Sequence, residues 1–178
     1  FLNWNPVAKF PKWLAEMPDL EKIEAKNTAI QSFPHFLSQS ESLKHLDLFG
    51  SPELVKFDTF SVFPYLEKLF LWDIHNKTPQ NWNAFPQLKH LDISRTGATY
   101  LDDSIGHLSK LEWLDIQSNS LSELPKALGN CQQMKVFKCS RNLLLDLPDF
   151  SNWQQIETLI ASENKLVITP TLFRLNPS

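Results

Sequence analysis

The chain of 178 residues repeats one hydrophobic pattern with a step of 22 or 23 residues. The pattern is anchored by apolar residues at these intervals: Leu20, Leu43, Leu66, Leu88, Leu111, Met134 and Ile156. The unit that begins at Leu111 shows the pattern most clearly, with Leu114, Ile116, Asn119 and Leu121 after the anchor. A period of this size predicts a stack of similar units in which each unit contacts only its neighbours.

Within each unit, the apolar spacing after the anchor predicts a short strand. The fourth and sixth residues point inward, and the residues beside them point outward, because side chains alternate along a strand. One such strand buries too little apolar surface to be stable, so the stacked units share one parallel sheet and one core. Six complete units and a partial unit at each end predict about eight strands.

The spacing Leu-x-x-Leu-x-Leu-x-x-Asn-x-Leu, followed by Leu124-Pro125 and Leu128, resembles the leucine-rich-repeat superfamily in its Leu-Pro-x-x-Leu form. The resemblance covers nearly the whole chain. It implies the α/β class: a curved solenoid with a parallel sheet on the concave face and short helical, 3-10 or extended segments on the convex face. We expect one domain over residues 1–178. Because neither end has a recognisable polar cap, we expect a fragment of a longer protein, or self-association through the ends.

The ninth residue of each unit forms a ladder that we expect to bond the backbone of adjoining turns. Its members are Asn5, Thr28, Ser51, Ile74, Thr96, Asn119, Asn142 and Asn164. The ladder weakens in the middle of the chain and fails at Ile74. The units 43–65 and 66–87 are also irregular, the second carrying Thr78-Pro79-Gln80-Asn81-Trp82 in place of Leu-Pro. Two alternative interpretations of this irregularity stay open: structural drift, or a local widening that shapes a binding surface.

The outward residues of the middle strands carry the strongest functional signal. Four large aromatics, Phe49, Phe70, Trp72 and Trp113, are expected to be exposed on adjoining strands of the concave face. Aromatic anchors ringed by polar groups are typical of binding hot spots. Alternatively, the rings fold over the sheet and cover one another. We expect orientation and charge complementarity to come from Asp73, His90, Asp92 and Arg95.

Catalytic and metal chemistry is not indicated. The pairs His45/Asp47 and His90/Asp92 are expected two strands apart, about 9–10 Å, which is too far for one metal ion. Asp92 and Asp115 should be neighbours, a spacing that retaining glycosidases use, but a solvated polar face explains them more simply. Their mutual repulsion should raise one pKa unless Arg95 or Lys138 compensates. No phosphate-binding loop is present, so we expect no enzyme, no metal and no cofactor.

These observations predict a protein–protein interaction module that binds a partner on its concave face. The resemblance leaves two alternatives open: the substrate-recruiting domain of a larger enzyme, such as a ubiquitin-ligase effector or a GTPase, and a surface or secreted protein that binds carbohydrate or peptide. The net charge of −3 does not favour nucleic acid, and no apolar run approaches the ~20 residues of a membrane span. Cys131 and Cys139 are expected to be buried, and the lack of cysteine-rich caps slightly favours an intracellular protein, with a secreted effector or surface protein still open.

Overall fold

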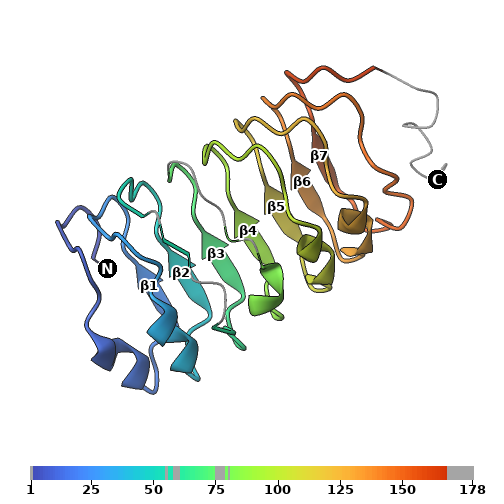
Figure 1. Cartoon of the computed structure of the whole chain (residues 1–178). Helices are drawn as coiled ribbons and strands as arrows, with labels where there is room; N and C mark the ends of the chain where they lie inside the picture. The colour runs from blue at the N-terminus through green and yellow to red at the C-terminus, as the bar shows by residue number, and fades with distance from the viewer. Residues whose placement is uncertain (1, 55, 58–60, 75–78, 80, 168–178) are drawn as a thin grey trace.

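The structure, a computed structural model, describes residues 2–54, 56–57, 61–74, 79 and 81–167, which form an open stack of coils (Figure 1). In the described residues, seven coils each contribute one three-residue strand to a sheet whose spatial order follows the sequence. The strands are β1 Lys22–Glu24, β2 His45–Asp47, β3 Lys68–Phe70, β4 His90–Asp92, β5 Trp113–Asp115, β6 Val136–Lys138 and β7 Thr158–Ile160. All neighbouring strands are parallel. The predicted α/β solenoid is therefore confirmed.

The register of the sheet follows from the repeat. Leu46 of β2 pairs with Leu69 of β3, and Leu91 of β4 pairs with Leu114 of β5. These four leucines are fully buried. A shift of one residue would turn every leucine to solvent, so burial of this row fixes the register.

In the part of the chain that the structure describes, the return segments of five coils each contain a short 3-10 helix, and these helices line the convex side. They are η1 Lys12–Glu16, η2 His35–Gln39, η3 Trp82–Ala84, η4 Asp103–His107 and η5 Lys126–Asn130. Pro11, Pro34 and Pro125 precede η1, η2 and η5, where the missing N–H of proline costs nothing. At η3 and η4 the side chains of Asn81 and Asp102 instead accept a backbone N–H, from Asn83 and Ser104.

The first, partial unit joins the sheet edge without forming a strand. The N–H of Leu2 donates to the Glu24 carbonyl at 2.7 Å, and that of Trp4 donates to the Lys26 carbonyl at 2.9 Å. The sheet of the described residues thus has seven strands. About eight strands were expected, but each strand occupies the third to fifth residues of its unit, and the first, partial unit contains only the fifth.

The predicted asparagine ladder is confirmed in the C-terminal half. The Nδ2 of Asn142 donates to the carbonyls of Ile116 and Cys139, at 2.9 and 3.0 Å, and its Oδ1 accepts the N–H of Leu121 at 3.0 Å. One buried amide therefore joins two consecutive turns. At the N-terminal end, Asn5 is exposed and bonds only within its own turn.

The irregular middle units differ in the structure as well. The described part of unit 43–65 contains no helix, and Lys56 instead forms an isolated bridge with Ser32. In unit 66–87, Ile74 and Trp82 are both fully buried. Thr78 and Gln80 of the unusual segment lie outside the described residues. A widening that shapes a binding surface stays a prediction.

Both cysteines are free and buried, as expected. The thiol of Cys131 donates to the Ile105 carbonyl at 3.3 Å. Burial raises the pKa of each thiol to about 12. Both side chains therefore act as small core residues, and neither is a nucleophile at neutral pH. Among the described residues, no helix has the length and apolarity that a membrane crossing requires.

Candidate partner-binding surface

The four predicted aromatic anchors project from the sheet face opposite the core. We call Phe49, Phe70, Trp72 and Trp113 the concave aromatic patch. Phe70 lies on β3 and Trp113 on β5, whereas Phe49 and Trp72 follow β2 and β3. All four are half-buried. The expectation that they are exposed was therefore wrong in degree, because each ring packs against a neighbouring aromatic group.

Phe49 and Trp72 form one half of the patch. Their ring centroids are 3.6 Å apart, and their planes differ by 13°. The two residues hold the same position in consecutive units, so the parallel register places one above the other. The stack covers one face of each ring, and stacked aromatics add about 0.5–1.5 kcal/mol beyond the area that they bury.

The other half crosses β2 to β5. The Phe70 ring lies 5.2 Å from His45 and 6.4 Å from Trp113, and the Trp113 ring lies 6.4 Å from His90. Phe70 and Trp113 therefore approach each other over the intervening strand β4. The Nζ of Lys138 lies 5.1 Å from the Trp113 ring centroid, a cation–π contact that covers part of the indole.

Burial decides the charge state of both histidines in this region. It lowers the pKa of His45 and of His90, and nearby lysines lower both further. His45 Nε2 and His90 Nδ1 are buried and have no hydrogen-bond partner among the described residues. Both imidazoles are therefore neutral at pH 7 and extend the aromatic surface rather than adding positive charge.

Asp73 and Arg95 lie in the turns that follow β3 and β4. Their φ angles are 57° and 53°, in the left-handed region. The N–H of Asp73 donates to the Ser94 carbonyl and that of Arg95 to the Gln117 carbonyl, both at 3.0 Å. The described residues include no ion pair of either side chain. Asp73 is half-buried and Arg95 is exposed, and their part in partner binding stays a prediction.

The left-handed turn recurs at the eighth residue of every unit. Its members are Trp4, Asn27, Gly50, Asp73, Arg95, Ser118, Arg141 and Glu163. Sequence reasoning missed this conformation because only one member is glycine, which is the residue that normally marks a positive φ. The position in the repeat could have indicated the left-handed turn, since each member directly precedes the ladder residue.

Asp92 lies at the centre of the sheet, beside Phe70 on β3 and Asp115 on β5. Its Oδ1 accepts the Ser94 N–H at 2.9 Å and the Ser94 hydroxyl at 2.7 Å. Burial raises the pKa of Asp92 to about 6, and Asp115 adds to this rise. The expected pKa rise in the Asp92/Asp115 pair is thus found, with burial rather than repulsion as its main cause. Of the two expected cations, Lys138 reaches Asp115, at 3.8 Å.

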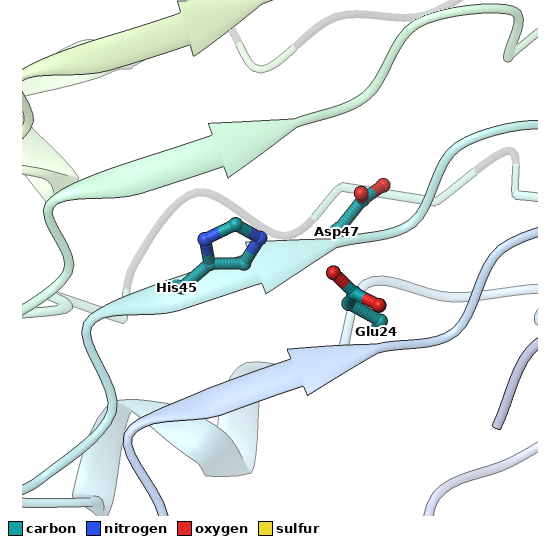
Figure 2. A group of neighbouring side chains, drawn as sticks. All are labelled: Glu24, His45 and Asp47. Atoms are coloured by element: carbon teal, nitrogen blue, oxygen red, sulfur yellow. The ribbon is translucent and has the colours of Figure 1, made fainter. Parts of the chain in front are cut away.

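One group of metal-ligand type occurs in the described residues, at Glu24, His45 and Asp47. The ligand atoms lie within 4.8 Å of one another, and Figure 2 shows a His45 ring nitrogen facing the two carboxylates. The third member comes from the neighbouring strand, which sequence reasoning did not consider. However, Lys22 lies 2.6 Å from the Glu24 carboxylate and Lys26 lies 3.1 Å from that of Asp47. Two ammonium groups therefore already neutralise the two carboxylates.

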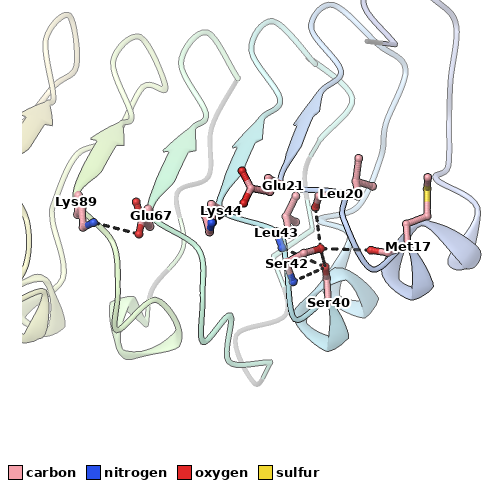
Figure 3. Close-up of polar contacts among 9 residues, drawn as sticks. All are labelled: Met17, Leu20, Glu21, Ser40, Ser42, Leu43, Lys44, Glu67 and Lys89. Atoms are coloured by element: carbon pink, nitrogen blue, oxygen red, sulfur yellow. Dashed lines mark hydrogen bonds and ion pairs between the residues drawn. The ribbon is translucent and has the colours of Figure 1, made fainter.

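Just before the strands, a second regular feature follows the whole sheet. The residue after each anchor alternates in charge: Glu21, Lys44, Glu67, Lys89, Glu112, Lys135 and Glu157. Ion pairs join Glu21 to Lys44 at 2.5 Å, Glu67 to Lys89 at 3.0 Å and Glu112 to Lys135 at 2.8 Å; Figure 3 shows the Glu67–Lys89 pair. We call this row the charge ladder. Sequence reasoning missed it, although the alternation is visible once the units are aligned.

Beside the charge ladder, a serine joins the end of the first complete unit to the segment that leads into β1. The hydroxyl of Ser42 donates to the carbonyls of Met17 and Leu20, at 3.3 and 3.1 Å (Figure 3). The Oγ of Ser40 accepts the Leu43 N–H at 3.2 Å. These bonds satisfy backbone groups before β1 and β2, and they concern stability rather than partner binding.

Comparison with known proteins agrees with this architecture. Residues 110–131 match the family model for the Leucine Rich Repeat. The chain is 29% identical over 147 residues to human leucine-rich repeat-containing protein 66, which covers 79% of this chain and 16% of that protein. It is 36% identical over 90 residues to leucine-rich repeat-containing protein 58 of Xenopus tropicalis, which covers 48% of this chain and 25% of that protein. The matched segment and both relatives therefore agree with the resemblance to leucine-rich-repeat proteins that the repeat pattern shows.

A solved structure extends the likeness to the fold. The chain resembles a chain in the crystal structure of the Arabidopsis receptor kinase HAESA in complex with the peptide hormone IDA and the co-receptor SERK1, with a TM-score of 0.68 and 25% identity. The match covers 88% of this chain and 28% of that chain. This chain therefore spans only a quarter or so of the solved protein, and 16–25% of the two curated relatives.

Proposed function

We propose that this chain is a protein-interaction module that binds its partner on the concave face, with the concave aromatic patch as its anchor. The observation that carries the proposal is the position of four large aromatic side chains on an open sheet face, each only half-buried. Contiguous apolar surface on a soluble domain commonly marks an interaction site. The complex of HAESA with a peptide hormone supports a binding role for a solenoid of this shape.

The geometry favours binding with little rearrangement. The strands are fixed by continuous backbone pairing, and Phe49 and Trp72 hold each other in place at 3.6 Å. A preformed surface loses less conformational entropy on association, so more of the contact energy appears as affinity. Asp73 and Arg95 lie in the turns that follow β3 and β4, and such charged groups can steer the orientation and association rate of a partner.

The test is affinity capture from a lysate of the source organism, comparing the wild type with a Phe70→Ser/Trp72→Ser/Trp113→Ser variant. A matched control carries Trp13→Ser, because Trp13 is 58% exposed and lies on η1, away from the sheet face. Circular dichroism and urea unfolding first establish that all three proteins are folded. The recovered partner is then measured by calorimetry against each variant.

We expect the wild type and the Trp13 variant to bind the partner equally, and the triple variant to lose at least 100-fold in affinity, since hot-spot aromatics contribute about 2 kcal/mol or more each. Equal binding by all three proteins would place the site off the concave face. A glycan array separates the carbohydrate alternative, because retention of glycans with no captured protein would contradict the proposed partner class.

A further inference from the structure

Acidic side chains line the concave end of the strands, and all but one of them are neutralised within the chain. Glu24 pairs with Lys22, Asp47 with Lys26, and Asp115 with Lys138. Asp92 occupies the same row, between Phe70 and Asp115. Among the described residues, no lysine, arginine or histidine lies within ion-pair distance of its carboxylate. Oδ1 is bonded to Ser94, and Oδ2 accepts no hydrogen bond within the described part of the chain.

One aromatic residue is the direct neighbour of this carboxylate in the sheet, and a second lies on the strand beyond, opposite His90. Phe70 is the neighbour of Asp92 on β3, and the Trp113 ring comes from β5 to within 6.4 Å of the Phe70 ring, across the strand that carries Asp92. A carboxylate beside aromatic faces attracts a cation twice, through its charge and through the ring quadrupoles. Partial burial strengthens both attractions, because water screens them less.

The chain already makes this arrangement once with its own cation. Lys138 places its Nζ 5.1 Å from the Trp113 ring centroid and 3.8 Å from Asp115. Lysine, carboxylate and indole therefore meet on β5 and β6. Asp92 has a carboxylate beside a ring but forms no ion pair among the described residues, and the Lys138 charge acts on it only at longer range, where it lowers the Asp92 pKa.

We propose that Asp92, with Phe70 and Trp113, forms a subsite for an arginine side chain of a protein partner. This inference rests on the proposed concave-face function and specifies the chemistry of the partner. Arginine fits better than lysine because its planar guanidinium stacks on aromatic rings while its N–H groups donate to a carboxylate edge. Asp115 on the adjoining strand adds negative charge beside the same point.

The first experiment titrates the protein with N-acetyl-arginine amide and follows the Trp indole N–H signals by NMR, with Trp113→Phe assigning the signal of Trp113. The neutral isostere N-acetyl-citrulline amide and N-acetyl-lysine amide are the comparison probes. Asp92→Asn removes the charge and keeps an oxygen for the Ser94 donors. Asp103→Asn is the matched control, because Asp103 is an exposed aspartate on η4.

We expect a saturable shift of the Trp113 signal with the arginine probe, a weaker one with lysine and none with citrulline. The shift should persist in Asp103→Asn and disappear in Asp92→Asn. No saturable shift with the arginine probe, or an equal shift in Asp92→Asn, would overturn the proposal.

The captured partner gives a second and independent test. Asp92→Asn should weaken its affinity at least tenfold, and replacing one arginine of the partner by glutamine should cause a similar loss that is not additive with the first. If the aromatic triple variant loses the partner while Asp92→Asn binds it with unchanged affinity, the arginine subsite is wrong and the proposed concave-face function stands. If the triple variant keeps the partner, the proposed function itself fails.

Discussion

The rings of Phe49 and Trp72 lie flat against each other, with centroids 3.6 Å apart and planes 13° from parallel. The two residues are 23 positions apart in the sequence, one repeat, and meet because the sheet pairs equivalent residues of neighbouring units. A side chain that points outward from its own unit is thus partly buried by the equivalent side chain of the next unit. This is why the concave face carries large aromatics without leaving them fully exposed.

The stack predicts that Trp72 contributes to stability as well as to binding. Trp72→Ala should lower the free energy of unfolding by about 1–3 kcal/mol, less than for a fully buried tryptophan because the indole keeps some contact with water. Urea denaturation measures the change. Trp13→Ala, at a tryptophan that is 58% exposed, should cost below about 0.5 kcal/mol. Equal losses at the two positions would show that the stack adds nothing.

The raised pKa of Asp92 predicts a pH-dependent cost in stability. Its pKa is about 6 in the folded chain and 3.8 in an ordinary environment. The folded state therefore holds the proton more tightly, so this group destabilises the fold above pH 6 and the cost disappears as the pH falls below 4. Asp92→Asn should stabilise the protein at pH 8 by at most about 3 kcal/mol.

The measurement is urea unfolding of the wild type and Asp92→Asn at several pH values between 4 and 8. The stabilisation should shrink steadily towards the acidic end of this range. Asp103→Asn, at an exposed position on η4, should show no such trend. A constant difference between Asp92→Asn and the wild type would mean that burial does not shift the Asp92 pKa.

The asparagine ladder predicts that substituting a buried member lowers the free energy of unfolding much more than substituting an exposed member. Asn142→Ala removes bonds to the carbonyls of Ile116 and Cys139 and to the Leu121 N–H, all buried, and should cost about 2–4 kcal/mol. Asn5 holds the equivalent position but is exposed, so Asn5→Ala should cost below about 1 kcal/mol. Thermal or urea unfolding of the pair tests this, and similar losses would refute the claim that burial of the amide decides its contribution.

The charge ladder predicts a contribution to stability that depends on salt concentration. Lys89→Glu would break the 3.0 Å pair with Glu67 and place a third carboxylate between Glu67 and Glu112. We expect a loss of about 0.5–1.5 kcal/mol at low salt, shrinking in 1 M NaCl, where the screening length is about 3 Å. Lys126→Glu, at an exposed position on η5 outside the ladder, is the control. If both variants lose the same amount at both salt concentrations, the alternation has no structural role.

Much of the fold could be predicted because the repeat is local. The leucines of the strands fix which face is buried, as the pairing of Leu46 with Leu69 shows. The ladder position was predicted from residue type, since the amide of Asn142 can satisfy both a carbonyl and an N–H in adjoining turns. The count of strands was overestimated by one, because the partial unit that holds Leu2 and Trp4 contains only the last of the three strand positions.

The candidate surface could be predicted only in part. Residue position placed Phe70 and Trp113 on the concave face, but their meeting over β4 depends on ring orientation, which the alternating pattern does not encode. Of the two cations expected to compensate Asp92 and Asp115, the structure brings only one to an aspartate. Lys138 reaches Asp115, whereas Arg95 forms no ion pair with either aspartate among the described residues.

The solenoid, its parallel register and the set of residues on each face follow from the sequence, because a 22–23-residue period repeats the same local pattern of inward and outward side chains. The contacts among the outward side chains depend on how neighbouring coils pack. Stacking across strands covers the aromatic rings, pairs most carboxylates with lysines and leaves Asp92 unpaired. The backbone of each unit sets which face of the sheet a side chain points to, whereas its contacts and its desolvation depend on the equivalent side chains of the neighbouring units.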